Sequence, residues 1–182
     1  MSKAAETFAQ AIQDAEHLLN HFNSLNKQPP PANAEVLKRA GLIMAMTAWE
    51  TYVEDRLQEA AATRLGGLTD EAIGAFVRGK LAEEIRRLHN PDAEKTGRLF
   101  RDFANVDVAA NWKWANFDPQ RAREQLNEYM KLRGDVVHRS RPLAEPGPPR
   151  AHPVTKEDLR KAIRFLKDLV EATERALVAQ SV

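Results

Sequence analysis

The sequence predicts an all-α protein, a single helical bundle of about five to six helices. Apolar residues recur with a period of about 3.6 in successive segments, and no segment shows a convincing alternation with the period of a strand. Proline and glycine clusters separate the helical segments, with a proline-rich turn at 28–33 and a proline-rich loop at 140–154. A chain of 182 residues is long enough to bury one core, so we expect one domain over residues 1–182.

The composition is that of a soluble globular protein, with 43% hydrophobic and 29% charged residues. The chain has no cysteine, which excludes a disulfide framework and a thiol nucleophile. Its net charge of +1 gives no overall attraction for nucleic acid, so any such binding must depend on a local basic patch. The sequence shows neither a signal peptide nor a membrane-spanning run, and a cytoplasmic location is therefore the expectation.

The first two helices are expected over residues 3–26 and from Asn33 to about Leu65. Proline residues 29–31 end the first helix, Asn33 caps the second, and Gly66-Gly67 closes it. Apolar residues cover most of the circumference of the second helix, which predicts a central helix packed on several sides.

A third helix is expected after Thr69 as its cap, and a fourth is expected to start at Asn90-Pro91 and continue through Phe103. The third carries one apolar face, made by Ile73, Phe76, Val77, Leu81, Ile85 and Leu88. The segment that follows, 106–117, contains Trp112 and Trp114. Exposed tryptophans could stack on bases, but large aromatic side chains more often fill cores, and we favour the core.

The fifth helix is expected from Asp118, with Asp118 as its cap and Pro119 at its first position. Arg133 falls near the middle of its apolar face, which is made by Ala122, Leu126, Tyr129, Met130, Val136 and Val137. Beyond the proline-rich loop, Thr155 and Asp158 form a capping box that begins the last helix.

Arg133 is the most informative residue because arginine is seldom buried without a partner. Either it pairs with Glu50 or Glu54 of the central helix, or it lines an interface or an anion site. His138 lies about 140° further round the same helix. One regular helix therefore does not direct both groups at one atom. Either Gly134 loosens the helix, or a second copy of the chain completes the site.

Several short motifs follow one another in a characteristic order. They are Ala48–Glu54, Asn90-Pro91, Leu99–Phe103, Asn111–Trp114 and Arg133–His138. Their order and spacing resemble the HEPN superfamily, and within it the RiboL-PSP-HEPN branch. The resemblance extends from about residue 8 to the last helix.

This resemblance implies a helical bundle that forms a two-fold dimer with its Arg-x4-His helices facing one another. Many HEPN proteins are metal-independent endoribonucleases that act as toxins, in phage defence or in RNA processing, whereas others bind RNA or proteins without catalysis. The family pattern usually has a polar residue directly after the arginine and a small one after the histidine. Here these positions hold Gly134 and Arg139, and Asp135 is the candidate to substitute for the missing polar side chain.

The chemistry expected of such a site needs neither metal nor cofactor. Histidine can accept or donate a proton at neutral pH, and arginine offers a fork of donors that matches phosphate oxygens. We therefore expect His138 to transfer protons and Arg133 to bind the phosphate of RNA. The expected supporting residues are Asp135, Glu50 and Glu54, and the expected RNA-binding residues are Lys131, Arg139 and Arg141.

Three functional hypotheses follow from the sequence. The first is a dimeric endoribonuclease that leaves 2′,3′-cyclic phosphate and 5′-hydroxyl ends, acting as a toxin or phage-defence effector with an antitoxin or other protein partner. The second is an inactive module that binds RNA or a protein. The third is a structural dimer in which Arg133 and His138 only pack the interface. His17 and His21 have a spacing that can chelate zinc, but the sequence offers no third ligand, and we expect no metal.

Overall fold

The computed structural model describes residues 1–25, 31, 34–138 and 154–179. These residues form six α-helices and one short 3₁₀ helix, and their only β-type pairing is an isolated bridge between Trp114 and Phe117. The predicted all-α bundle is thus confirmed. The helices are α1 (Lys3–Ser24), α2 (Glu35–Leu65), α3 (Glu71–Arg86), α4 (Ala93–Ala104), η1 (Ala109–Asn111), α5 (Pro119–His138) and α6 (Lys156–Ala179).

The two proline-rich segments, 28–33 and 140–154, lie for the most part outside the described residues, as does the expected cap Asn33. Among the helices that are described, none carries an apolar stretch long enough to cross a bilayer.

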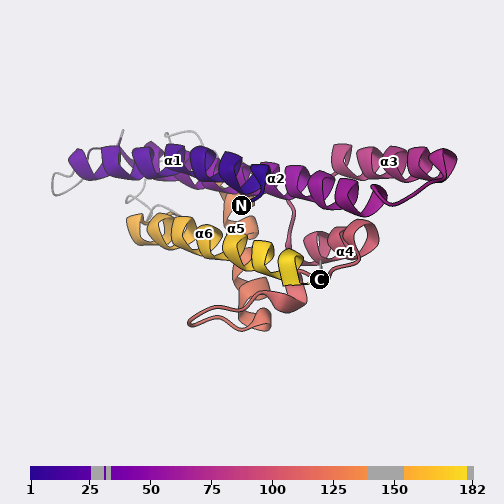
Figure 1. Cartoon of the computed structure of the whole chain (residues 1–182). Coiled ribbons are helices and arrows are strands. Elements are labelled where there is room, and N and C mark those ends of the chain that lie inside the picture. The colour runs from indigo at the N-terminus through magenta and orange to yellow at the C-terminus, as the bar shows by residue number, and fades with distance from the viewer. Residues whose placement is uncertain (26–30, 32–33, 139–153, 180–182) are drawn as a thin grey trace.

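Helix α2 is the centre of the bundle, as its apolar circumference predicted. It lies alongside α1 and also contacts α3, α4, α5 and α6, while α6 packs against α1 as well (Figure 1). Its buried side chains point in several directions, and Trp49, Leu42, Val53 and Leu57 are fully enclosed. Because each of the other described α-helices packs on it, α2 is the element against which the remaining side chains are positioned.

Tryptophans of two distant segments meet in the core. Trp49 and Trp112 are both 0% exposed, and their ring centroids lie 6.1 Å apart in an edge-on arrangement. The indole N–H of Trp49 donates to the carbonyl oxygen of Pro91 (2.9 Å), and that of Trp112 donates to Thr173 Oγ1 (2.9 Å). The core position predicted for Trp112 is confirmed. Trp114 is half-buried, and its ring centroid lies 5.6 Å from that of Phe165.

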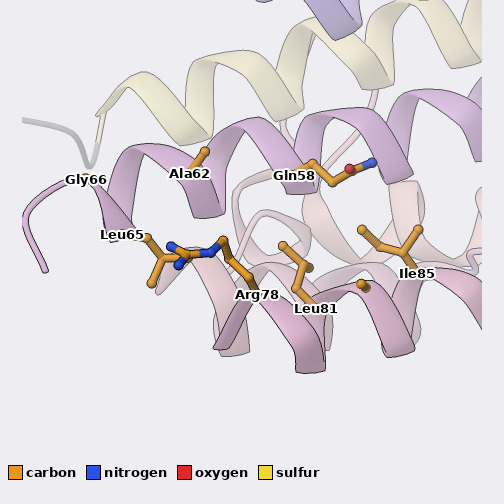
Figure 2. Close-up of a pocket in the computed structure, with 8 residues that line it drawn as sticks. Gln58, Ala62, Leu65, Gly66, Arg78, Leu81 and Ile85 are labelled. Atoms are coloured by element: carbon orange, nitrogen blue, oxygen red, sulfur yellow. The ribbon is translucent and has the colours of Figure 1, made fainter. Parts of the chain in front are cut away.

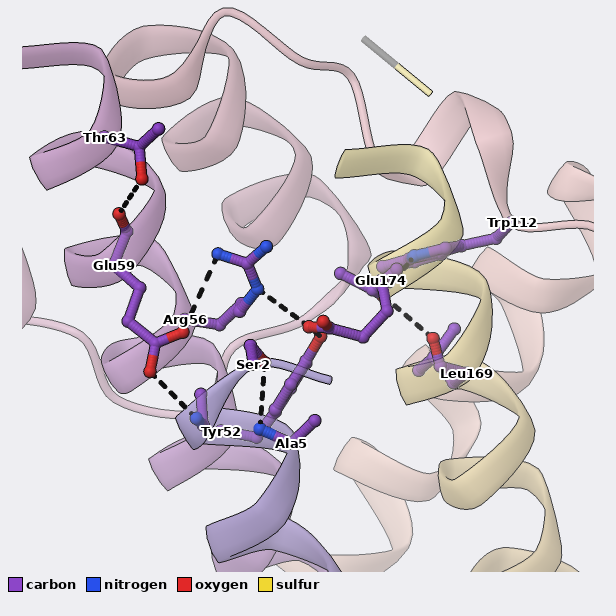
Figure 3. Close-up of polar contacts among 11 residues, drawn as sticks. Ser2, Ala5, Tyr52, Arg56, Glu59, Thr63, Trp112, Leu169 and Glu174 are labelled. Atoms are coloured by element: carbon purple, nitrogen blue, oxygen red, sulfur yellow. Dashed lines mark hydrogen bonds and ion pairs between the residues drawn. The ribbon is translucent and has the colours of Figure 1, made fainter. Parts of the chain in front are cut away.

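A polar cluster joins the start of α1 and the end of α6 to α2 (Figure 3). Glu174 Oε1 accepts hydrogen bonds from the hydroxyl of Tyr52 (2.8 Å) and from Arg56 Nε (2.7 Å). Glu59 Oε1 accepts from the backbone N–H of Ala4 (2.9 Å). Burial, followed by the nearby Glu174 carboxylate, raises the pKa of Tyr52 well above its usual value of 10. The phenol therefore stays protonated and acts as a donor.

Helix α3 departs from the prediction. Its cap is Asp70 rather than Thr69, since Asp70 accepts hydrogen bonds from the backbone N–H groups of Ala72 and Ile73. Its predicted core face is covered only toward its end, where Leu81 and Leu88 are buried. Near its start, Ile73 is 50% and Phe76 66% exposed. The reason is topological, because α3 extends beside the far end of α2 and packs chiefly on that helix (Figure 1).

The predicted caps of the last two helices are confirmed. Asp118 accepts from the backbone N–H of Arg121 (2.9 Å) at the start of α5. At the start of α6, Asp158 accepts from the backbone N–H of Thr155 (2.9 Å), and Thr155 Oγ1 accepts from that of Asp158 (3.1 Å).

The buried bond between Trp112 and Thr173 gives a test of the core. Thr173→Val keeps the shape of the side chain but leaves the indole N–H of Trp112 without its acceptor. We expect the free energy of unfolding to fall by about 1–3 kcal/mol, measured by chemical denaturation. Thr63→Val is the matched control, because Thr63 also bonds a carbonyl four residues earlier but is exposed. Its effect should be within about 0.5 kcal/mol, and equal losses in the two variants would contradict the assignment.

Candidate functional site

The helix that carries Arg133 and His138 is continuous. α5 runs from Pro119 to His138 as one α-helix and passes through Gly134 without interruption. A side chain at Gly134 would meet nothing within 4 Å among the described residues, so no close contact there requires glycine. Of the two arrangements that the sequence left open, a loosened helix at Gly134 is therefore not what the structure has. The backbone keeps the 133 and 138 positions about 140° apart.

Arg133 projects from α5 onto α2, where it meets two side chains. Its Nη2 lies 3.4 Å from Glu50 Oε2, and its Nη1 donates to Asn90 Oδ1. The ion pair is partly buried, with the Arg133 side chain 22% and the Glu50 side chain 18% exposed. The predicted pairing of Arg133 with a carboxylate of the central helix is thus found, and Glu50 is the partner.

Asn90 was expected to begin a helix, but it lies in the turn two residues before the cap of α4. α4 is capped by Asp92, whose side chain accepts from the backbone N–H of Lys95 (2.8 Å). Asn90 adopts a left-handed backbone conformation with φ of 52°, which asparagine tolerates better than most residues. Its backbone N–H donates to Glu50 Oε1 (3.1 Å). The Glu50 carboxylate therefore holds both the backbone of Asn90 and the guanidinium of Arg133.

The next residue, Pro91, fixes this turn to the core through the carbonyl oxygen that accepts from Trp49. Trp49 and Glu50 are neighbours in α2. Trp49 therefore binds the turn from the core, and Glu50 binds it at the surface. Sequence reasoning missed the contact between Asn90 and Arg133. The signal was an asparagine directly before a proline, a pair typical of a turn, but nothing in the sequence aligned that turn with residue 133.

Glu54 lies one helical turn beyond Glu50, and of these two acids the structure pairs only Glu50 with Arg133. Burial, then the carboxylates of Glu50 and Asp55, raises the pKa of Glu54 above its usual 4.5, and His89 opposes this shift. The two predicted acidic residues therefore differ. Glu50 has a cation and a backbone N–H to bind, whereas the charged form of Glu54 is disfavoured by burial and by neighbouring acids.

The remaining predicted site residues are only partly described. Lys131 is exposed on α5 and Asp135 is half-buried there. His138 is the last residue of α5, but its side chain, together with Arg139 and Arg141, lies outside the described residues. Within the described ranges, the structure brings Arg133 and Glu50 together and adds Asn90.

The arrangement around Arg133 suits an anion. Arginine has five N–H donors in a planar fork. One bonds the neutral amide of Asn90, one faces a single carboxylate, and the Nε atom is buried without a hydrogen-bond partner among the described residues. Among the described residues, neither terminal nitrogen has a second hydrogen-bond acceptor. A guanidinium held in this way can bind two phosphate oxygens in one plane.

Two hollows between the described helices lie away from this site. One, of about 480 Å³, opens between α2 and α3, where the guanidinium of Arg78 extends toward Leu65 (Figure 2). Another, of about 950 Å³, runs between α1 and α6 and is lined by apolar residues that include Phe8 and Ile12. Neither is lined by Arg133. In the described part of the chain, no three histidine or acidic residues are placed to hold a metal ion.

Comparison with known proteins gives one match. The model of the RiboL-PSP-HEPN family matches residues 6–179, nearly the whole chain. No curated protein and no solved structure matches the sequence.

The contrast between Glu50 and Glu54 can be measured. Glu50→Gln removes the charge that faces the partly buried Arg133, so the free energy of unfolding should fall by about 1–2 kcal/mol at pH 7. Glu54→Gln should instead raise it, by no more than about 1 kcal/mol, because the fold disfavours the charged carboxylate. Chemical denaturation of both variants and the wild type provides the values.

The effect of Glu54→Gln should also depend on pH. The pKa of Glu54 is higher in the folded chain than its usual 4.5, so the fold loses stability as the pH rises from 4.5 through the raised value. The gain from Glu54→Gln should therefore be small below pH 4.5 and complete at neutral pH. A gain that is the same at both pH values would contradict the assigned cause.

Proposed function

Because the chain belongs to the RiboL-PSP-HEPN family, we propose that it is a metal-independent endoribonuclease. In this proposal Arg133 binds the scissile phosphate and His138 transfers protons. The observation that carries it is the presentation of Arg133, a partly buried guanidinium that contacts Glu50 and Asn90 and has no further acceptor on its terminal nitrogens among the described residues. An arginine needed only for packing would be expected to have its charge and donors fully matched within the fold.

The reaction requires three events at one phosphodiester. A base removes the proton of the 2′-hydroxyl, the 2′-oxygen forms a bond to phosphorus, and the bond from phosphorus to the 5′-oxygen breaks as that oxygen gains a proton. Imidazole groups can take the base and acid roles at neutral pH. Arg133 would stabilise the extra negative charge on the phosphate oxygens. The products are a 2′,3′-cyclic phosphate and a 5′-hydroxyl.

We propose that two copies of the chain form the active unit. α5 is regular through Gly134, so residues 133 and 138 face directions about 140° apart. A two-fold axis beside α5 would bring His138 of one copy toward Arg133 of the other, and the two imidazoles would share the base and acid roles. A two-fold arrangement is also the commonest one for homo-oligomers.

RNA would be attracted by a local patch of positive charge on and after α5. Lys131 is exposed there, and Arg139 and Arg141 follow in the sequence. Contacts of lysine and arginine with phosphates release counterions, so binding should weaken with salt and depend little on sequence. The proposed setting is the cytoplasm, where such an enzyme would act as a toxin or defence effector, with an antitoxin as its proposed protein partner.

The alternative is an inactive module that binds RNA or a protein. The observation that favours it is Gly134, which supplies no side chain where the family pattern usually has a polar one, and around which the described residues leave open space. Such a module would still use Arg133 to bind phosphate.

Cleavage of RNA in EDTA by the wild type and by His138→Ala separates the two functions. We expect cyclic-phosphate fragments from the wild type, and a loss of about 10²–10⁴ in rate on removal of the imidazole. Arg133→Lys should also lower the rate, because lysine keeps the charge but not the planar fork. Analysis of the product ends by mass spectrometry identifies the chemistry.

The controls are His17→Ala and Arg123→Ala, which remove exposed residues of the same types from α1 and α5. Both should cleave like the wild type. Fragments with 5′-phosphate ends, or activity that chelation abolishes, would overturn the proposed reaction. Salt-sensitive RNA binding without any cleavage would favour the inactive module.

A further inference from the structure

We propose that Asn90 is a positioning residue for Arg133, and that its neutral amide orients the guanidinium without offsetting the positive charge that would attract an RNA phosphate. The inference rests on the proposed function, and it assigns a role to a residue outside α5. Three features of the turn before α4 support it. These are the contact of the Asn90 side chain with Arg133, its place on the exposed side of the guanidinium, and the rigidity of its backbone.

The two partners of Arg133 lie at different depths. The bond to Glu50 is partly buried, whereas the bond to Asn90 lies at the surface. A phosphate that approaches Arg133 from solvent would therefore arrive beside Asn90. The amide of Asn90 offers its oxygen to Arg133 and still has an N–H₂ group that can donate to an anion. A carboxylate at the same place would repel it.

The charge around Arg133 follows from this arrangement. Glu50 is the single carboxylate that the structure pairs with the guanidinium among the described residues. That carboxylate is also shared, because its other oxygen accepts from the backbone N–H of Asn90. Arg133 thus gains orientation from two side chains, only one of which carries a negative charge. A second acid would hold the guanidinium more strongly and leave it little attraction for phosphate.

The backbone of Asn90 is restrained on both sides of the residue. Its N–H is held by Glu50, and its carbonyl oxygen accepts from the backbone N–H of Asp92 (2.8 Å). Lys95 Nζ contacts the carbonyl oxygens of His89 (3.0 Å) and Asn90 (3.4 Å). Pro91 is anchored by Trp49. A side chain mounted on so fixed a turn can set the orientation of Arg133, which precise phosphate binding requires.

Stability alone does not account for an asparagine at this position. Aspartate also tolerates the left-handed conformation, has an oxygen of the same geometry, and would add an ion pair to Arg133. A purely structural role would thus be served at least as well by aspartate as by asparagine. An uncharged residue at position 90 is therefore expected where the site binds an anion, but it is not needed for a purely structural contact.

Two substitutions that suit the backbone test this role. Asn90→Asp keeps the shape of the side chain but adds a negative charge and removes the N–H₂ donor. Asn90→Gly removes the side chain while keeping the φ of 52° accessible. We expect Asn90→Asp to unfold at the same or a higher temperature, yet to bind single-stranded RNA about tenfold more weakly. The slope of log affinity against log salt should shrink by about 0.7, the value for one lost phosphate contact.

Asn90→Gly should show a different pattern. Its side chain no longer orients Arg133, so we expect kcat to fall about tenfold or more while KM changes less. NMR of the arginine side chains gives a readout that needs no RNA. The guanidinium of Arg133 should rotate slowly about its Nε–Cζ bond in the wild type and faster in Asn90→Gly.

The matched controls are Asn105→Asp and Asn105→Gly. Asn105 also has a left-handed backbone, with φ of 56°, but it caps the other end of α4. RNA binding by Asn90→Asp that equals that of Asn105→Asp, in a wild type that cleaves RNA, would overturn the role of Asn90 and leave the proposed ribonuclease standing. A wild type that neither binds nor cleaves RNA would overturn the proposed function itself, and this role with it.

Discussion

The hydrogen bond from the buried indole of Trp49 to the carbonyl oxygen of Pro91 is the constraint from which the candidate site follows. An indole N–H enclosed in a core must find an acceptor, since leaving it unpaired costs about 1–3 kcal/mol. Here the acceptor belongs to the turn before α4. The turn is therefore held against α2 at the level of Trp49, and the residue after Trp49 is Glu50. Core packing thereby places Asn90 and Glu50 together, where Arg133 of α5 reaches both.

The electrostatics of this corner result from partial burial. The Arg133 side chain is too buried for water alone to solvate its charge, and too exposed to require that its charge be fully neutralised by protein groups. Glu50 supplies one compensating charge. Glu54, one turn further, is disfavoured in its charged form by burial and by Glu50 itself. The surroundings thus give the two acids different roles. Glu50 fixes a cation, whereas the charge of Glu54 slightly destabilises the fold.

Much of the bundle can be predicted from sequence because its signals are local. The caps at Asp118 and at Thr155 with Asp158 need only neighbouring residues, and the apolar circumference of α2 already marks it as central. The caps of α3 and α4 lie one and two residues later than predicted, at Asp70 and Asp92. The larger failures concern long-range placement. Periodicity gave α3 a core face, but none of the described elements covers Ile73 and Phe76. The sequence predicted Glu50 or Glu54 as the partner of Arg133 and could not distinguish them. Which acid pairs with Arg133 depends on where α5 crosses α2.

The same geometry supports the proposal that a second copy of the chain contributes to the chemistry. Arg133 is committed to α2 by Glu50 and Asn90, and α5 continues without a break to His138. If the Arg133 side chain turned toward residue 138 of its own helix, both contacts would break and Glu50 would lose its cation. Because this ion pair is partly buried, breaking it costs more free energy than breaking an exposed ion pair. Relaxing the helix at Gly134 would sacrifice backbone hydrogen bonds in its last turn. In the proposed reaction, an imidazole from a second subunit would reach this guanidinium without either cost, and this is the argument for the proposed dimer.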